Sequence, residues 1–123
     1  MISKIEIKRF VETSLNERRQ LEMTTDPSKQ LFLCEMIDGP DGAEKRKSTG
    51  PAHHAYQASV MDSFIARGPM RTDDGRGVIG TMYIIQVDDR AAAEAFVAAE
   101  PMNAAGVFSE VRIDRWRFGK SID

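Results

Sequence analysis

The sequence of 123 residues has one cysteine, two histidines, and no long apolar run. A single cysteine, Cys34, cannot form an internal disulfide, so we expect a reducing, cytoplasmic location. No window approaches the roughly 18 apolar residues of a membrane span, and we therefore expect no membrane partner. The N-terminal segment 1–20 interrupts each apolar pair with a charge, which is unlike a signal peptide.

The sequence also lacks an excess of charge of either sign. Seventeen Lys and Arg residues face 19 Asp and Glu residues, for a formal net charge of −2. Nucleic-acid binding usually needs a basic surface, so we expect no nucleic-acid partner. The motifs G-x-G-x-x-G, G-x-x-x-x-G-K-[ST], G-x-S-x-G and C-x-x-C are missing as well, and we expect no cofactor.

What is present is the composition of one globular domain, with 41% hydrophobic and 29% charged residues. Residues 1–29 differ from the rest and are predicted to be an N-terminal helical extension and linker. Three apolar residues at four-residue spacing form its stripe: Ile7, Val11 and Leu15. This helix packs either on its own domain or on a partner. The domain itself is expected over residues 30–123.

The hydrophobic pattern of residues 30–123 predicts alternating strands and helices. Strands are expected at 31–37, near 67–71, at 78–87 and at 107–118. Helices are expected from Pro51 to Phe64, after a polar loop at 43–50, and over 90–100, capped by Asp88 or Asp89. This order is the ferredoxin-like βαββαβ unit of the α+β class, an antiparallel sheet with two helices on one face.

The strands at 31–37 and 78–87 are apolar on both faces. Two helices can cover only one face of the sheet, so the other face needs a second cover. A second copy of the chain, packed sheet to sheet as a homodimer, is the simplest cover. The N-terminal helix is the competing candidate.

The two histidines are adjacent, and on a helix neighbours in sequence do not face each other. A metal site built on His53 and His54 is therefore not expected, because helical metal ligands are spaced by three or four residues. His53 lies within the apolar stripe of its predicted helix. It is either a structural histidine bonded to a backbone carbonyl or carboxylate, or a general acid/base.

A catalytic histidine needs a carboxylate that orients the ring. Asp73 and Asp74 are the candidates, although Asp-Asp-Gly is also ordinary turn chemistry. Glu35 lies between apolar positions of a strand and is expected to have a partner. Arg46 is that partner, the holder of an anionic ligand, or a solvated loop charge.

The chain resembles the YciI-like (YCII-related) family of small ferredoxin-like proteins, which are relatives of the dimeric α+β barrels and muconolactone isomerases. The resemblance rests on five stretches in family order: EKRKSTGPAHHAY (44–56), ARGPMRTDDG (66–75), GTMYIIQVDDRAAAEAF (80–96), EPMNAAGVF (100–108) and EVRIDRW (110–116). It implies a homodimer of the dimeric α+β barrel type. It also implies a cleft that holds a His–Asp pair.

The resemblance assigns the family histidine to His53, which follows Pro-Ala, and the family aspartate to Asp74, with Asp73 as the alternative. Arg46 matches a basic residue upstream of the helix. Candidates for substrate binding are Arg46, Tyr56 and Glu35, with packing in the core as the other interpretation of Tyr56.

Some positions depart from the family pattern. Gly50 stands where many members have an arginine, so a cation that anchors the substrate is missing there. His54 replaces a common leucine, and Glu100 replaces the aspartate usual before Pro101. Residues 1–29 fall outside the pattern.

Two functional hypotheses follow. The first is a cofactor-independent lyase or isomerase, similar to a dehydrochlorinase or muconolactone isomerase, acting on a small cyclic carbonyl compound such as a quinone or lactone. His53 would move the proton and Asp74 would orient it. The alternative is a non-catalytic small-molecule-binding or accessory domain that docks through its N-terminal helix.

Overall fold

The computed structural model describes residues 25–119. Four strands form one antiparallel sheet in the order β2-β3-β1-β4. The elements are β1 (Gln30–Asp38), α2 (Gly42–Ser59), the 3₁₀ turn η1 (Met61–Ser63), β2 (Phe64–Arg71), β3 (Val78–Val87), α3 (Arg90–Ala98), α4 (Pro101–Ala104) and β4 (Phe108–Trp116). This confirms the predicted α+β, ferredoxin-like architecture. The helix predicted within 1–29 lies almost entirely outside the described residues.

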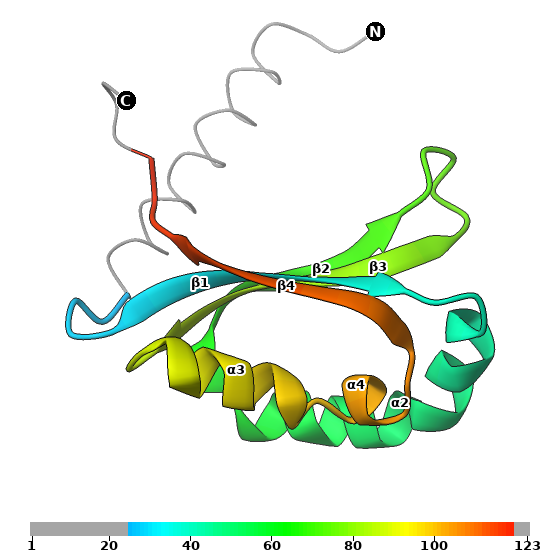
Figure 1. Cartoon of the computed structure of the whole chain (residues 1–123), viewed down its shortest axis with the longest axis horizontal. Helices are drawn as coiled ribbons and strands as arrows, with labels where there is room; N and C mark the ends of the chain where they lie inside the picture. The colour runs from blue at the N-terminus through cyan, green and yellow to red at the C-terminus, as the bar shows by residue number, and fades with distance from the viewer. Residues whose placement is uncertain (1–24, 120–123) are drawn as a thin grey trace, which may run out of the picture.

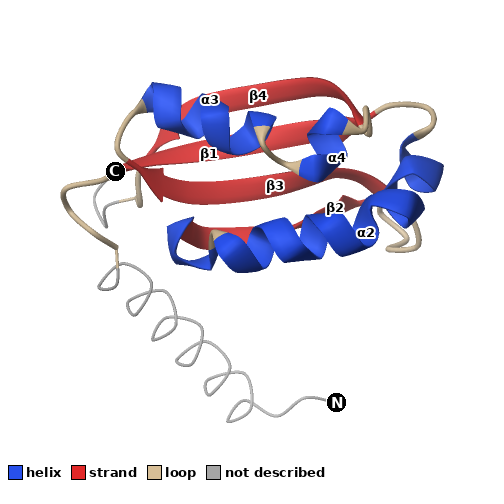
Figure 2. Ribbon diagram, turned by 90° about the horizontal axis from the view of Figure 1, so that it is seen from below, coloured by secondary structure: helices blue, strands red, loops and turns tan. Residues whose placement is uncertain are grey.

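The helices all cover one face of the sheet (Figures 1 and 2). The strands alternate in consequence, because successive side chains of a strand point to opposite faces. In β1, Phe32, Cys34 and Met36 are buried under the helices, while the residues between them are only half-buried on the outer face. The core on the helix side comprises Phe32, Cys34, Met36, Tyr83, Ile85, Ala93, Phe96 and Val97.

Helix α2 begins earlier than its sequence predicts. The stretch 43–50, predicted to be a polar loop, is helical, and Pro51 lies inside the helix. A proline inside a helix removes the hydrogen bond to the carbonyl four residues earlier and bends the helix, and Figure 1 shows that α2 changes direction along its length. Contacts of Arg46 with Asp38 and Thr81 tie this first part of α2 to the sheet.

The C-terminal end of α2 also differs from the prediction. The helix ends at Ser59, so Phe64, predicted to be helical, is the first residue of β2. Its ring packs edge to face against Tyr83 and Phe96. Burial of this aromatic cluster outweighs the helical periodicity that Phe64 shares with Tyr56 and Val60.

Strands β1, β3 and β4 and helix α3 agree with their predicted ranges to within two residues, whereas η1 and α4 were not predicted. Asp89, one of two predicted caps, accepts a hydrogen bond from the Ala92 backbone N–H at the start of α3. Of the helices that the structure describes, none has the length and apolarity to cross a membrane.

Candidate active site

A histidine and a glutamate that are far apart in the sequence meet beneath the helices. The Nδ1 atom of His53, on α2, lies 2.7 Å from Oε1 of Glu100, in the link between α3 and α4. The Glu100 side chain is fully buried and the His53 side chain is 13% exposed. Burying a carboxylate costs free energy unless hydrogen-bond donors surround it. The structure around Glu100 must therefore supply such donors.

Local structure holds Glu100 in place. It precedes Pro101, and the residue before a proline is disfavoured in helical conformation, so the chain is extended between α3 and α4. Oε1 also accepts the backbone N–H of Met102 at 3.1 Å, while Oε2 accepts the Tyr83 hydroxyl at 2.6 Å. With Nδ1 of His53, three hydrogen-bonding groups surround the carboxylate.

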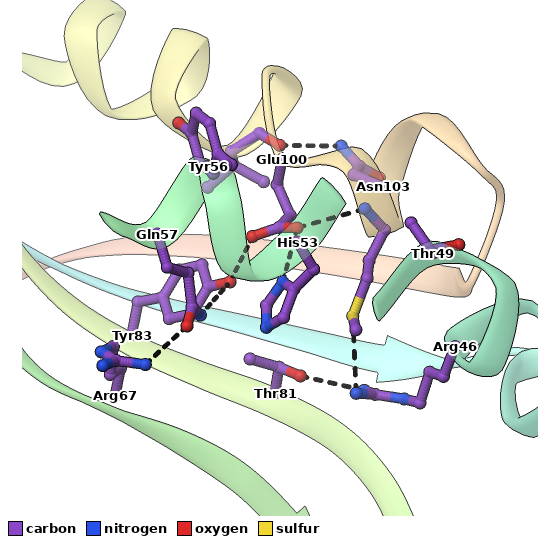
Figure 3. A network of polar contacts seen from close by, with 12 residues as sticks. Arg46, Thr49, His53, Tyr56, Gln57, Arg67, Thr81, Tyr83, Glu100 and Asn103 are labelled. Carbon is purple, nitrogen blue, oxygen red and sulfur yellow. Dashed lines mark hydrogen bonds and ion pairs between the residues drawn. The ribbon is translucent and has the colours of Figure 1, made fainter. Parts of the chain in front are cut away.

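A chain of polar contacts continues from Glu100 to the protein surface (Figure 3). Gln57 Nε2 lies 3.4 Å from the Tyr83 hydroxyl oxygen, and the Arg67 guanidinium donates to Gln57 Oε1 at 2.5 Å. Burial, followed by the hydrogen bond to Glu100, raises the pKa of Tyr83 well above its ordinary value. The Tyr83 hydroxyl therefore remains a proton donor to Glu100 at neutral pH.

The His–Glu pair borders a cleft of about 340 Å³ between α2 and the strands β2 and β3. The cleft is lined by Arg46, Gly50, His53, His54, Gln57, Arg67, Gly68, Pro69, Thr81 and Met102. The imidazole points from α2 toward the sheet, between Glu100 and Thr81 (Figure 3). Because Nδ1 is engaged by Glu100, Nε2 is the ring nitrogen left for a molecule in the cleft.

This arrangement suits proton transfer. A carboxylate that accepts a hydrogen bond from Nδ1–H selects the tautomer in which Nε2 carries a lone pair. It also stabilises the imidazolium that forms when Nε2 takes a proton. A histidine held in this way, at the wall of a cleft large enough for a small ring compound, can accept a proton through Nε2 and return it.

The predicted partners of His53 lie elsewhere. Asp73 and Asp74 are exposed residues of the hairpin between β2 and β3, and neither lines the cleft. Asp74 accepts hydrogen bonds from the Thr72 hydroxyl and the Arg76 backbone N–H, and the Thr72 bond is the main cause that lowers the pKa of Asp74. Glu100, and not Asp73 or Asp74, is the carboxylate on His53, because Asp-Asp-Gly here serves the turn.

Arg46 lines the cleft, as a binding candidate should, but it lies on α2 and its partner is not Glu35. The guanidinium donates through Nε and Nη2 to both carboxylate oxygens of Asp38, each at 2.7 Å, and Nη2 also donates to the Thr81 hydroxyl at 2.9 Å. This bidentate pair fixes Arg46 at one end of the cleft.

The other two binding candidates are outside the cleft. Glu35 lies on the outer face of the sheet, opposite Arg112 of β4, because its neighbours in β1 are buried on the helix side. The Tyr56 hydroxyl donates to the Phe96 carbonyl at 2.7 Å, and its ring packs edge to face on Phe96, so Tyr56 joins α2 to α3.

Sequence reasoning missed four residues of the site: Gln57, Arg67, Tyr83 and Glu100. One signal was available for Glu100, since an acidic residue directly before Pro101 was visible as a departure from the family pattern. The partners Gln57 and Arg67 carried no such signal, because their proximity arises from packing α2 against β2.

Within residues 25–119, no three His, Cys, Asp or Glu side chains lie close enough to hold a metal ion. A second surface cleft of about 430 Å³ contains Lys29, Asp62 and Asp88. There Lys29 and Asp88 already form an ion pair with each other, and no histidine is present. The smaller cleft, which contains His53, is therefore the better candidate for an active site.

Known proteins are similar to this chain in sequence and in fold. Residues 30–117 match the family described as the YCII-related domain. Protein YciI from Escherichia coli and its counterpart from Shigella flexneri are each 32% identical to the chain over 90 residues, which is 68% of this chain and 92% of theirs.

A solved structure is similar as well. It is 5-chloro-2-hydroxyhydroquinone dehydrochlorinase (TftG) from Burkholderia phenoliruptrix, in complex with 2,5-dihydroxybenzoquinone. The TM-score is 0.66 at 26% sequence identity, and the match covers 72% of this chain and 95% of that one.

Proposed function

Because the chain belongs to the YCII-related domain family, we propose that it is a cofactor-independent lyase or isomerase for a small cyclic carbonyl compound of the quinone or lactone type. The observation that carries the proposal is the 2.7 Å contact between His53 and the buried Glu100 at the wall of the cleft. His53 acts as general acid/base and Glu100 orients it.

The reaction needs only this pair and the substrate. Nε2 of His53 takes a proton from a carbon or hydroxyl conjugated with the carbonyl, and the electrons of the broken bond pass into an enolate. In an isomerase the imidazolium returns the proton to another carbon. In a lyase the enolate electrons expel a leaving group such as chloride, so the net change is loss of HCl.

The structural neighbour supports the quinone class. TftG is named as a dehydrochlorinase of a hydroxylated hydroquinone, and its complex holds a dihydroxybenzoquinone. In this chain a cleft of about 340 Å³ suits a single substituted ring. Binding of such a molecule is therefore part of the proposal.

The proposal also includes a homodimer in a cytoplasmic setting. The outer sheet face carries half-buried apolar residues on the central strands, with Leu33 of β1 opposite Ile84 of β3. An apolar sheet face of this kind favours a second copy as its cover. The cytoplasmic location stays a prediction, as does docking through residues 1–29, which are mostly outside the described part.

The test is turnover by the full chain. We would incubate it with 5-chloro-2-hydroxyhydroquinone and follow chloride release, and incubate it separately with unsaturated lactones in D₂O to follow deuterium incorporation by NMR. We expect turnover that His53→Asn reduces by about 10²–10⁴-fold. His54→Asn is the comparison, since His54 lines the same cleft without a carboxylate partner among the described contacts, and a smaller loss than that of His53→Asn is expected.

Each outcome separates the hypotheses. Turnover that persists in His53→Asn would contradict the assignment of the general base. Ring compounds that bind in the cleft without turnover or deuterium exchange would favour the non-catalytic binding protein instead.

A further inference from the structure

The cleft is lined by basic and not by acidic side chains, in a protein of net negative charge. Its lining contains two arginines and two histidines but, among the described residues, neither Asp nor Glu. The whole chain, by contrast, carries 17 Lys and Arg and 19 Asp and Glu residues. A cleft lined by one sign of charge raises the local concentration of ligands of the opposite sign.

Two of these basic side chains already have a carboxylate partner that does not line the cleft. Arg46 is held by Asp38 with bidentate geometry, and both side chains are largely buried, at 17% and 9% exposure. His53 has Glu100 as its partner, so a proton on its ring would be balanced there. Neither group offers an uncompensated charge to a ligand.

Arg67 differs from both. Its guanidinium contacts Gln57 Oε1, the Met61 sulfur and, at 5.4 Å from the ring centroid, the face of Phe64. These partners are neutral, and the ion pairs found within residues 25–119 do not include Arg67. Its full positive charge therefore faces the cleft without a carboxylate.

We infer that Arg67 anchors an anionic ring compound, an enolate or carboxylate, and so determines the charge of the substrate. This inference rests on the proposed function, which it deepens by naming the substrate class. Arginine binds such oxygens with paired, charge-assisted hydrogen bonds. Gln57 accepts a hydrogen bond from Arg67 and so orients the guanidinium.

The spacing fits one ring. Gln57 and His53 are one helical turn apart on α2, a separation of about 5–6 Å between Cβ atoms. Arg67 contacts Gln57, so its guanidinium lies beside one of these two side chains. Nε2 of His53, whose Nδ1 contacts Glu100, is available at the other. A substituted six-membered ring can span it, with its anionic oxygen on Arg67 and its reacting atom at His53.

The test compares two ligands that differ in charge. 2,5-Dihydroxybenzoquinone is a vinylogous acid and is ionised at neutral pH, whereas 2,5-dimethoxybenzoquinone has the same ring and no charge. We would measure both affinities by isothermal titration for the wild type, Arg67→Gln, Arg67→Lys and Arg71→Gln. Arg71 is the matched control, an exposed arginine on the same strand that bonds the Gly75 carbonyl and does not line the cleft.

We expect Arg67→Gln to weaken binding of the dihydroxy compound by about 10- to 100-fold, the size of one charge-assisted hydrogen bond. The dimethoxy compound should bind weakly and equally to both proteins. Arg67→Lys should retain part of the affinity, and Arg71→Gln all of it. A Cβ on Gly50 would meet no atom within 4 Å, so adding Gly50→Arg to Arg67→Gln should restore affinity by placing a cation on the facing wall.

Two results would overturn the inference. Equal losses for both ligands in Arg67→Gln would mean that Arg67 only shapes the cleft, and an unchanged affinity for the anion would mean that it does not contact the ligand. Neither result would bear on the proposed function, which depends on His53 and Glu100 and is tested by turnover. A wild type that binds neither quinone, nor a carboxylated lactone, would overturn the proposed function together with the inference.

Discussion

His53 and Glu100 are 47 residues apart in sequence, and their side chains meet at 2.7 Å beneath the helices of a ferredoxin-like sheet. Tyr83, from the central strand β3, shares the same carboxylate. The pair thus connects α2, β3 and the α3–α4 link, so the groups proposed for chemistry also contribute to the stability of the domain.

The carboxylate that orients His53 can be identified by comparing two isosteric changes. We expect Glu100→Gln to lower turnover about 10²-fold or more, because the amide cannot stabilise an imidazolium as a carboxylate does. Asp74→Asn should leave turnover unchanged, since Asp74 bonds within its own hairpin. Steady-state kinetics would decide, and a loss confined to Asp74→Asn would instead support the partner predicted from the sequence.

Tyr83→Phe should destabilise the fold more than Tyr56→Phe. The first change removes a hydrogen bond to a buried carboxylate, worth about 1.5–3 kcal/mol, and the second a bond to the Phe96 carbonyl, worth about 0.5–1.5 kcal/mol. Urea unfolding of both variants would measure the difference. Equal losses would indicate that Glu100 finds another donor when the Tyr83 hydroxyl is removed.

The Cys34 thiol should be unreactive in the folded protein. It is fully buried, and burial raises its pKa to about 12. At pH 8 roughly one thiol in ten thousand would be ionised, and only the thiolate is a nucleophile. Iodoacetamide labelling followed by mass spectrometry should be slow in buffer and fast in denaturing urea. Rapid labelling of the native protein would show that the core opens around β1.

A charge at the centre of the outer sheet face should prevent dimerisation. Ile84 is half-buried opposite Leu33, so Ile84→Arg would place a cation where a second sheet is proposed to pack. We expect analytical ultracentrifugation to find a dimer for the wild type and a monomer for the variant. Arg71→Gln, on a strand at the edge of the sheet, is the control. A wild-type monomer would contradict the proposed dimer.

Local patterns in the sequence were sufficient for the strands. The run 78–87 is β3 residue for residue, because a short run rich in β-branched and aromatic residues, apolar on both faces, favours a strand. A similar apolar run of strand length, 31–37, predicted β1. Together with the helix predicted over 90–100, observed as Arg90–Ala98, these strands indicated the ferredoxin-like order.

Tertiary structure decided the boundaries of α2 and the partner of His53. The local sequence at Pro51 predicts a helix start. The helix nevertheless begins nine residues earlier, at Gly42, where contacts of Arg46 with β1 and β3 hold its first turns. Asp74 read locally as a nearby carboxylate, but its hydrogen bonds are satisfied within a turn. Which carboxylate reaches His53 depends on how α2 packs against the α3–α4 link, and such long-range packing leaves no periodicity in the sequence.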